Sequence, residues 1–241
     1  MTQQSSKFPS EAEVVIVGVG GIVGSMVAYW LAELGQKNIV GLEKSTIIPS
    51  DIASTAHASD FVYNTTHDKL GCWATNFSRK FYEDNGFFLK KGGLEICRKD
   101  DDARWEELKR KVESGKAFGT NIRLISASEA KEKFPLLDEE SIRGAMWDPD
   151  AGLVTPRSQD VVNFAVETAK EKGALSTFTD TPAIDFDVEN GRITGVKTDK
   201  GTIKTNKVVI TSGIWGPLMG KKAGVPVPLM PVEHPLLFFG P

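Results

Sequence analysis

The sequence predicts an α/β fold built around a parallel sheet, and three consecutive features near the N-terminus lead to this prediction. Residues Val14–Val17 form an unbroken β-branched run that ends in glycines, as in a central strand buried on both faces. Across Ile22–Leu34 the apolar residues recur at helical spacing, and Gly35 provides the stop. Residues 38–42 then form a second strand, which is followed by Glu43. A strand, a glycine turn, a helix and a second strand within about 30 residues make one βαβ unit, the core of a Rossmann-like domain.

Further helical segments are expected in the middle of the chain. Residues 67–85 have helical periodicity, and residues 101–114 carry charges on most faces, which predicts a solvated helix. Ser126 and Glu129 have the spacing of a capping box at the start of another helix. A last helix is expected from Thr155-Pro156 to Lys172, because proline favours a helix start and the following glycine favours a stop. Residues 91–96 have the pattern of a turn that leads into a strand.

From residue 175 onward the pattern changes to short alternating strands, which predicts an antiparallel meander. The strands are expected at residues 176–178, 184–188, 193–198 and 202–205, with turns at 189–191 and 199–201. Residues 207–211 are again a β-branched run, so the chain is expected to return to the parallel sheet, and residues 231–239 predict a final apolar strand. The predicted architecture is therefore a Rossmann-like α/β domain with a parallel sheet, plus an antiparallel-sheet α+β domain.

The composition restricts the classes of function. The 241 residues are 40% hydrophobic and 25% charged, which is typical of a globular protein of one or two domains. Because 29 basic residues nearly balance 32 acidic ones, neither a nucleic-acid surface nor a polybasic membrane anchor is expected. No uninterrupted run of about 18 apolar residues occurs, so no membrane span is predicted. Cys72 and Cys97 lack the spacing of a zinc site or a disulfide framework, which favours a reducing, cytoplasmic location and no metal site.

The glycine turn after the first strand has the chemistry of a diphosphate-binding site. Backbone N–H groups at a helix N-terminus can approach a diphosphate closely where no side chain intervenes, and the helix dipole favours its charge. The residues expected to form this site are Gly18, Gly20, Gly21, Ile22, Val23 and Gly24. The spacing is irregular, because Val23 occupies the position of the third glycine and Gly24 follows one residue late. A glycine turn without a ligand therefore stays open as the alternative.

Glu43, at the end of the second strand, is expected to accept hydrogen bonds from the ribose hydroxyls of an adenosine diphosphate moiety. Its negative charge would repel a 2′-phosphate, which argues against NADP. The residue does not separate NAD from FAD, since both contain the same adenosine diphosphate half.

Several segments, in order and with similar spacing, carry a family resemblance that covers almost the whole chain. They are Glu13–Glu43, Ala53–Ala58, Gly92–Ile96, Asp150–Val154, Gly191–Val196, Thr211–Trp215 and Pro228–His234. Together they resemble the dimethylglycine oxidase, dimethylglycine dehydrogenase and sarcosine dehydrogenase group of the D-amino-acid-oxidase-like flavoproteins. The resemblance implies an FAD-dependent amine oxidoreductase.

The resemblance also implies roles for residues outside the glycine turn. His57 corresponds to the histidine that attaches the flavin covalently, and His234 matches an active-site histidine that could hold or deprotonate a substrate amine. Without the resemblance, His57 would be interpreted as a polar loop residue and His234 as a histidine that closes a strand. The other expected cofactor contacts are Lys44 beside Glu43, Ser54, Thr55 and Ala56 beside the flavin, Phe61 near its ring, and Ala183 near the adenine.

The domain organisation and the reaction follow from the same resemblance. Residues 1–90 and 150–224 are expected to form the FAD-binding domain, and residues 91–149 and 225–241 an incomplete substrate domain, because members of the family continue beyond the residue that matches Pro241. The expected reaction is N-demethylation of a small secondary or tertiary amine, such as dimethylglycine or sarcosine, by hydride transfer to the flavin. Oxygen or a redox carrier would accept the electrons. An NAD-dependent dehydrogenase and a non-catalytic FAD-binding fragment are the alternatives.

Overall fold

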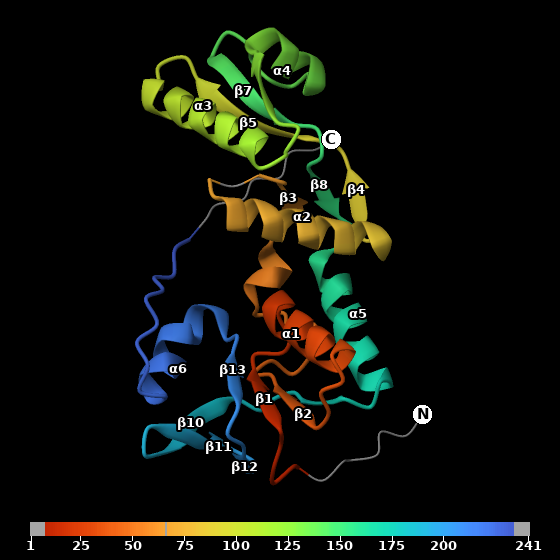
Figure 1. Cartoon of the computed structure of the whole chain (residues 1–241), viewed down its shortest axis with the longest axis vertical. Coiled ribbons are helices and arrows are strands. Elements are labelled where there is room, and N and C mark those ends of the chain that lie inside the picture. Colours follow the sequence, from red (N-terminus) through yellow and green to blue (C-terminus); the bar gives the residue numbers. More distant parts are fainter. Residues whose placement is uncertain (1–7, 66, 234–241) are drawn as a thin grey trace. The chain divides into compact units, whose positions relative to one another are not determined.

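The computed structural model describes residues 8–65 and 67–233, which divide into two compact units (Figure 1). Unit 1 contains the chain up to Ser59 together with the chain from Arg157 onward, and unit 2 contains Asp60–Pro156. The predicted domain boundaries differ from this division, because they place residues 60–90 and 150–156 with the first domain and residues 225–241 with the second. The assignment of FAD binding and substrate binding to separate domains stays a prediction.

Unit 1 contains the predicted parallel sheet. Its strands are β1 (Val14–Val17), β2 (Ile39–Leu42), β9 (Leu175–Phe178) and β13 (Val208–Ile210), in the order β13-β1-β2-β9. Every neighbouring pair is parallel, and all residues of β1 and β2 are buried. The unbroken apolar runs in the sequence therefore correspond to strands that are covered on both faces.

The two faces of this sheet contact different layers. Val14 and Ile16 point into a cluster with α1 (Ile22–Glu33) and α5 (Ser158–Glu171), which pack against each other (Figure 1). Val15 and Val17 point into a second cluster, because side chains alternate along a strand. The second cluster includes residues of the antiparallel sheet β10 (Ala183–Glu189), β11 (Arg192–Thr198) and β12 (Gly201–Lys204), and of helix α6 (Gly216–Lys222).

The prediction of an antiparallel meander from residue 175 is wrong for its first strand. β9 pairs in parallel with β2, with Leu175 opposite Ile39, so only β10, β11 and β12 form the meander. A four-residue strand carries no local signal that distinguishes the two sheets, because its partner lies far away in the sequence. The helix expected from Thr155-Pro156 begins at Ser158, and no strand is assigned to residues 231–233. The rest of the predicted final strand lies outside the described residues.

Unit 2 contains the antiparallel sheet β5 (Gly93–Arg98), β7 (Ile142–Asp148) and β6 (Arg123–Ser126), in the order β5-β7-β6. A small sheet joins β3 (Phe61–Val62), β8 (Gly152–Val154) and β4 (Phe88–Lys90). The helices are α2 (Lys69–Asp84), α3 (Asp102–Ala117) and α4 (Ala127–Lys133).

Two predictions concern these helices. The capping box of Ser126 and Glu129 is confirmed at the start of α4. Most of α3 is exposed or half-buried, as predicted for a charged helix, but Leu108 and Val112 are buried in a cluster with Met146 of β7, which the prediction did not include. Their i, i+4 spacing creates one apolar stripe on an otherwise charged helix.

Candidate functional site

A cavity of about 370 Å³ lies in unit 1 at the carboxyl ends of three parallel strands. Val17 of β1, Leu42 of β2 and Thr211 after β13 line it. Ligands of open α/β sheets bind in this position, outside the carboxyl ends of the strands. The volume falls within the range of about 300–1,000 Å³ that is usual for small-molecule sites.

The structure explains the irregular glycine spacing. Gly18 has a φ of +96°, and a Cβ on Gly24 would collide with Gly18 O, so both glycines are needed for the turn itself. A Cβ on Gly20 would lie 2.5 Å from Glu43 Oε2. Gly21, in contrast, has only ordinary contacts near its Cβ position, and it lines the cavity. Gly21 therefore lines the cavity and, in contrast to the other glycines of the turn, has room at its Cβ position.

Glu43 is 6% exposed and lies beneath the glycine turn at the end of β2. Its Oε2 accepts a hydrogen bond from Gly20 N–H at 2.9 Å. Its Oε1 accepts from Ser45 N–H at 2.9 Å and from the Ser50 hydroxyl at 3.1 Å. The carboxylate thus holds the turn in place and at the same time lines the cavity.

The loop after β2 ends in a short 3₁₀ helix, η1 (Ser54–His57), which lies against the start of α1. Ile22 N–H donates to Thr55 Oγ1 at 3.0 Å, and Ser54 and Thr55 line the cavity. Ala56 and His57 belong to the same turn but lie outside the lining. Nε2 of the exposed His57 forms a 3.1 Å hydrogen bond with Asp51 O.

The structure brings most of the predicted cofactor contacts to one place. Gly18, Gly21, Ile22, Val23, Glu43, Lys44, Ser54, Thr55 and Ala183 all line the cavity. Gly20 and Gly24 do not line the cavity, but the turn has no room for a Cβ at either position. Phe61 lies in β3 of unit 2, and His234 lies outside the described residues, so their predicted roles stay predictions.

Sequence reasoning missed one whole wall of the cavity. The residues from Thr211 to Trp215 line it, together with Thr181, Pro182, Leu218 and Met219. The Lys44 ammonium lies 4.7 Å from the centre of the Trp215 ring, which is a cation–π geometry. Ser212 Oγ is buried and has no hydrogen-bond partner among the described residues. The available signal was the position of residues 211–215 directly after a β-branched run, where a parallel strand ends.

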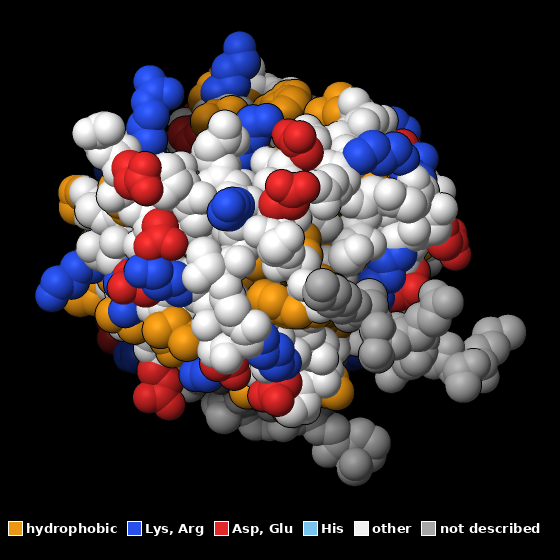
Figure 2. Space-filling view, turned by 90° about the horizontal axis from the view of Figure 1, so that it is seen from below, with side chains coloured by type: hydrophobic (Ala, Val, Ile, Leu, Met, Phe, Trp, Pro, Cys, Tyr) orange, Lys and Arg blue, Asp and Glu red, His pale blue; other side chains and the backbone are white. Residues whose placement is uncertain are grey.

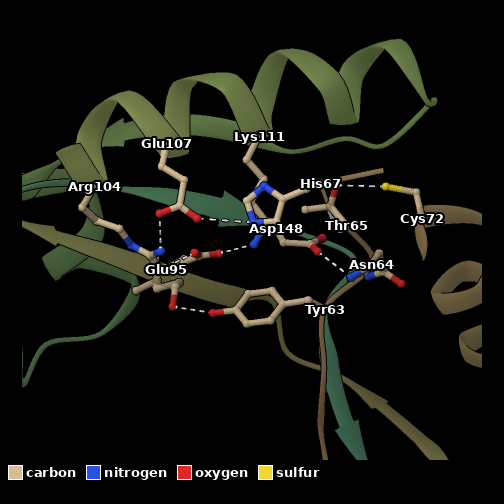
Figure 3. Close-up of polar contacts among 11 residues, drawn as sticks. Tyr63, Asn64, Thr65, His67, Cys72, Glu95, Arg104, Glu107, Lys111 and Asp148 are labelled. Carbon is tan, nitrogen blue, oxygen red and sulfur yellow. Dashed lines mark hydrogen bonds and ion pairs between the residues drawn. The ribbon is translucent and has the colours of Figure 1, made fainter. Parts of the chain in front are cut away.

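A second polar cluster lies in unit 2 (Figure 3). Glu95 forms ion pairs with Arg104 and Lys111. The distance from Glu95 Oε2 to Lys111 Nζ is 2.7 Å, and the side chains of Glu95 and Lys111 are 12% and 11% exposed. The Tyr63 hydroxyl donates to Leu94 O at 2.7 Å. Burial, together with the charges of Glu95 and Asp148, raises the pKa of Tyr63 to about 12. These contacts join α3 to β5, so they serve the packing of unit 2.

The described residues contain no group of three or more histidine, cysteine or acidic side chains that could hold a metal ion. Within the same part of the chain, no helix has the length and apolar character needed to cross a membrane. On the face drawn in Figure 2, acidic and basic side chains of the described residues are intermixed.

Comparison with known proteins identifies the family. A family model described as "FAD dependent oxidoreductase" (DAO) matches residues 13–241. The chain belongs to this family of FAD-dependent oxidoreductases. FAD contains an adenosine diphosphate half, which is the moiety predicted to bind at the glycine turn and Glu43.

Individual relatives support the same assignment. Human mitochondrial sarcosine dehydrogenase is 29% identical over 95% of this chain, and the mouse mitochondrial pyruvate dehydrogenase phosphatase regulatory subunit is 30% identical over 95%. The chain spans 26% of the length of each of these relatives. The structure of L-proline dehydrogenase from P. horikoshii matches with a TM-score of 0.80 and 32% identity, over 90% of this chain and 57% of that one.

Proposed function

We propose that the cavity of unit 1 binds FAD and that this chain is the N-terminal part of an oxidoreductase for small secondary or tertiary amines. The observation that carries the proposal is the buried Glu43 carboxylate, which accepts from Gly20 N–H and lines the same cavity as Gly21, in a chain of the FAD-dependent oxidoreductase family. The substrate class is supported by the similarity to sarcosine dehydrogenase and by the resemblance of the sequence to dimethylglycine-oxidising proteins.

The residues around the cavity fit the adenosine diphosphate half of FAD. Gly21, Ile22 and Val23 line the cavity at the N-terminus of α1, where backbone N–H groups and the helix dipole favour a diphosphate. Glu43 can accept a hydrogen bond from a ribose hydroxyl. Ser212, whose buried hydroxyl has no hydrogen-bond partner among the described residues, also lines the cavity. When bound, the flavin supplies an acceptor for the hydride that leaves the carbon next to the amine nitrogen.

His57 is proposed as the covalent attachment site of the flavin. A carbonyl oxygen only accepts hydrogen bonds, so the contact with Asp51 O requires a proton on His57 Nε2. A neutral ring then carries its free lone pair on Nδ1, and this is the nucleophilic nitrogen. The tether would prevent loss of the cofactor.

The role of His234 in holding or deprotonating the substrate amine is proposed from the family resemblance. A histidine with an ordinary pKa near 6.5 can take up a proton from an ammonium group, which must be neutral before it can lose a hydride from the adjacent carbon. Oxygen or a redox carrier is proposed as the electron acceptor. Both named relatives are mitochondrial proteins, and the cytoplasmic location of this chain stays a prediction.

A second candidate function is an FAD-binding regulatory subunit without catalytic activity. The 30% identity to the regulatory subunit of pyruvate dehydrogenase phosphatase favours it. The NAD-dependent dehydrogenase that the βαβ unit alone left open is not favoured, because the family model that matches is that of FAD-dependent enzymes.

An absorption spectrum before and after acid precipitation tests the cofactor and its linkage. We expect the purified chain, incubated with FAD, to show flavin absorbance that stays in the acid pellet. His57→Ala should bind FAD but release it on acid treatment, whereas His67→Ala, an exposed histidine of unit 2, should behave like the wild type. Acid-stable flavin in His57→Ala would eliminate the linkage.

Anaerobic addition of sarcosine or dimethylglycine separates the two candidate functions. Bleaching of the flavin absorbance supports the amine oxidoreductase. Flavin that is bound but keeps its colour with both amines, in a protein that includes the whole substrate domain, supports the regulatory subunit.

A further inference from the structure

Ser50 connects the glycine turn to the carboxylate of Glu43. Its backbone N–H donates to Gly20 O at 2.9 Å, and its hydroxyl donates to Glu43 Oε1 at 3.1 Å. The residue is 1% exposed and lines the cavity. One residue of the loop that follows β2 therefore fixes both the turn and the acidic group beneath it.

The hydrogen bonds among the described residues leave one acceptor position on Glu43. Oε1 accepts from Ser45 N–H and from the Ser50 hydroxyl, while Oε2 accepts from Gly20 N–H. A carboxylate oxygen has two lone pairs, so the two oxygens together accept about four hydrogen bonds. Oxygen Oε1 is thus filled, and the acceptor that remains for a ligand is on Oε2.

We infer that Ser50 is a positioning residue that makes the cavity select adenosine diphosphates with free ribose hydroxyls. The inference rests on the proposed function, because it assigns the adenosine half of the ligand to Glu43. With the Ser50 hydroxyl on Oε1, the carboxylate is held in one rotation and its single free lone pair on Oε2 has a fixed position. A ribose hydroxyl pairs with that acceptor, whereas a ribose without hydroxyls leaves a buried charged acceptor unpaired.

Loss of the Ser50 hydroxyl leaves the fold-determining contact of this residue intact. The hydrogen bond from Ser50 to Gly20 O comes from the backbone, so Ser50→Ala keeps it. The carboxylate of Glu43 then keeps only its two backbone donors, Ser45 N–H on Oε1 and Gly20 N–H on Oε2, and is held less firmly in its rotation. Ribose selection should therefore fall, while the turn keeps its shape.

Calorimetric titration of the whole chain with ADP and with 2′,3′-dideoxyadenosine diphosphate tests the inference. The wild type should bind ADP at least about tenfold more tightly than the dideoxy analogue, because one hydrogen bond to a charged group has about this effect on a dissociation constant. In Ser50→Ala the ratio of the two dissociation constants should shrink to about threefold or less. Ser50→Thr, which retains a hydroxyl, should keep the wild-type ratio, and Thr46→Ala, at an exposed position of the same loop, should not change it.

A double-mutant cycle separates positioning of Glu43 from general packing. In a Glu43→Gln background, adding Ser50→Ala should leave the ratio unchanged, because the group that Ser50 positions has lost its charge. Ribose discrimination that survives Ser50→Ala, or that falls equally in both backgrounds, would overturn the inference alone. A wild-type chain that binds neither FAD nor ADP would overturn the proposed function, and the inference with it.

Discussion

Alanine substitutions at Gly20 and Gly21 are expected to separate the folding of the glycine turn from its ligand binding. The two residues are adjacent, yet their surroundings differ. A Cβ on Gly20 would lie 2.5 Å from Glu43 Oε2 and 2.7 Å from Ser50 Cβ, both of which are buried. A Cβ on Gly21 would have its nearest neighbours at 3.6 and 3.7 Å, at Thr55 Oγ1 and Ala53 Cβ.

These distances determine how much unfolding free energy each substitution should cost. Gly20→Ala overpacks the turn at a cost of about 1–3 kcal/mol and displaces a hydrogen bond to a carboxylate worth about 1.5–3 kcal/mol, so a loss of about 3 kcal/mol in unfolding free energy is expected. Gly21 has φ −98° and ψ 168°, which alanine adopts without strain. Its replacement at the N-cap should change stability by no more than about 1 kcal/mol, because the stiffer unfolded chain offsets part of any cost.

The effect on FAD affinity should not follow stability. The new methyl group at Gly21 enters the cavity where the backbone would approach the diphosphate, so the dissociation constant should rise about tenfold or more. Urea unfolding measures the unfolding free energy, and titration with FAD measures the dissociation constant. A Gly21→Ala protein that binds FAD like the wild type would refute the assignment of the turn, and equal destabilisation by both substitutions would refute the packing argument.

Three further predictions concern the polar cluster of unit 2 and the missed wall of the cavity. Glu95→Ala should lower the unfolding free energy by about 3 kcal/mol, because it leaves the mostly buried Lys111 ammonium without its ion-pair partner, while Arg104 keeps its pair with Glu107. Glu113→Ala, which removes an exposed ion pair, should change it by less than about 1 kcal/mol in the same denaturation assay. Since the pKa of Tyr63 is raised from 10.0 to about 12 in the folded state, the unfolded chain loses this proton first, and stability should fall as pH rises from about 10 to about 12. Tyr63→Phe should make that fall shallower in pH-dependent denaturation, and an unchanged slope would contradict the pKa shift. Trp215→Leu should raise the dissociation constant of FAD about threefold through loss of the ring beside Lys44, while Trp73→Leu in unit 2 should leave FAD titrations unchanged.

The elements that local sequence determines could be predicted. The β-branched run of β1, the helical spacing of α1 and the glycines between them each act over a few residues, and the structure confirms the parallel strand, the turn and the helix. The same holds for the capping box at Ser126. Glu43 could be identified because it directly follows a strand that the pattern already showed.

Features that depend on distant partners could not be predicted. The pairing of β9 with β2 joins Leu175 to Ile39, and nothing within residues 175–178 indicates it. The contact of Lys44 with Trp215 likewise crosses most of the chain. Ser50 is close to Glu43 in sequence, but its hydrogen bond depends on how the loop folds back over the glycine turn. The apolar residues Leu108 and Val112 of α3 are visible in the sequence at helical spacing, but the many charged residues around them led to the prediction of a solvated helix.

Saturable binding of FAD by the purified chain tests the central claim most directly. Equilibrium dialysis against FAD should give one equivalent bound per chain, with Glu43→Lys binding much more weakly because the substitution removes the acceptor for the ribose and disrupts the turn. Equal FAD concentrations in the protein compartment and in the dialysate, at every FAD concentration up to the millimolar range, would contradict the account.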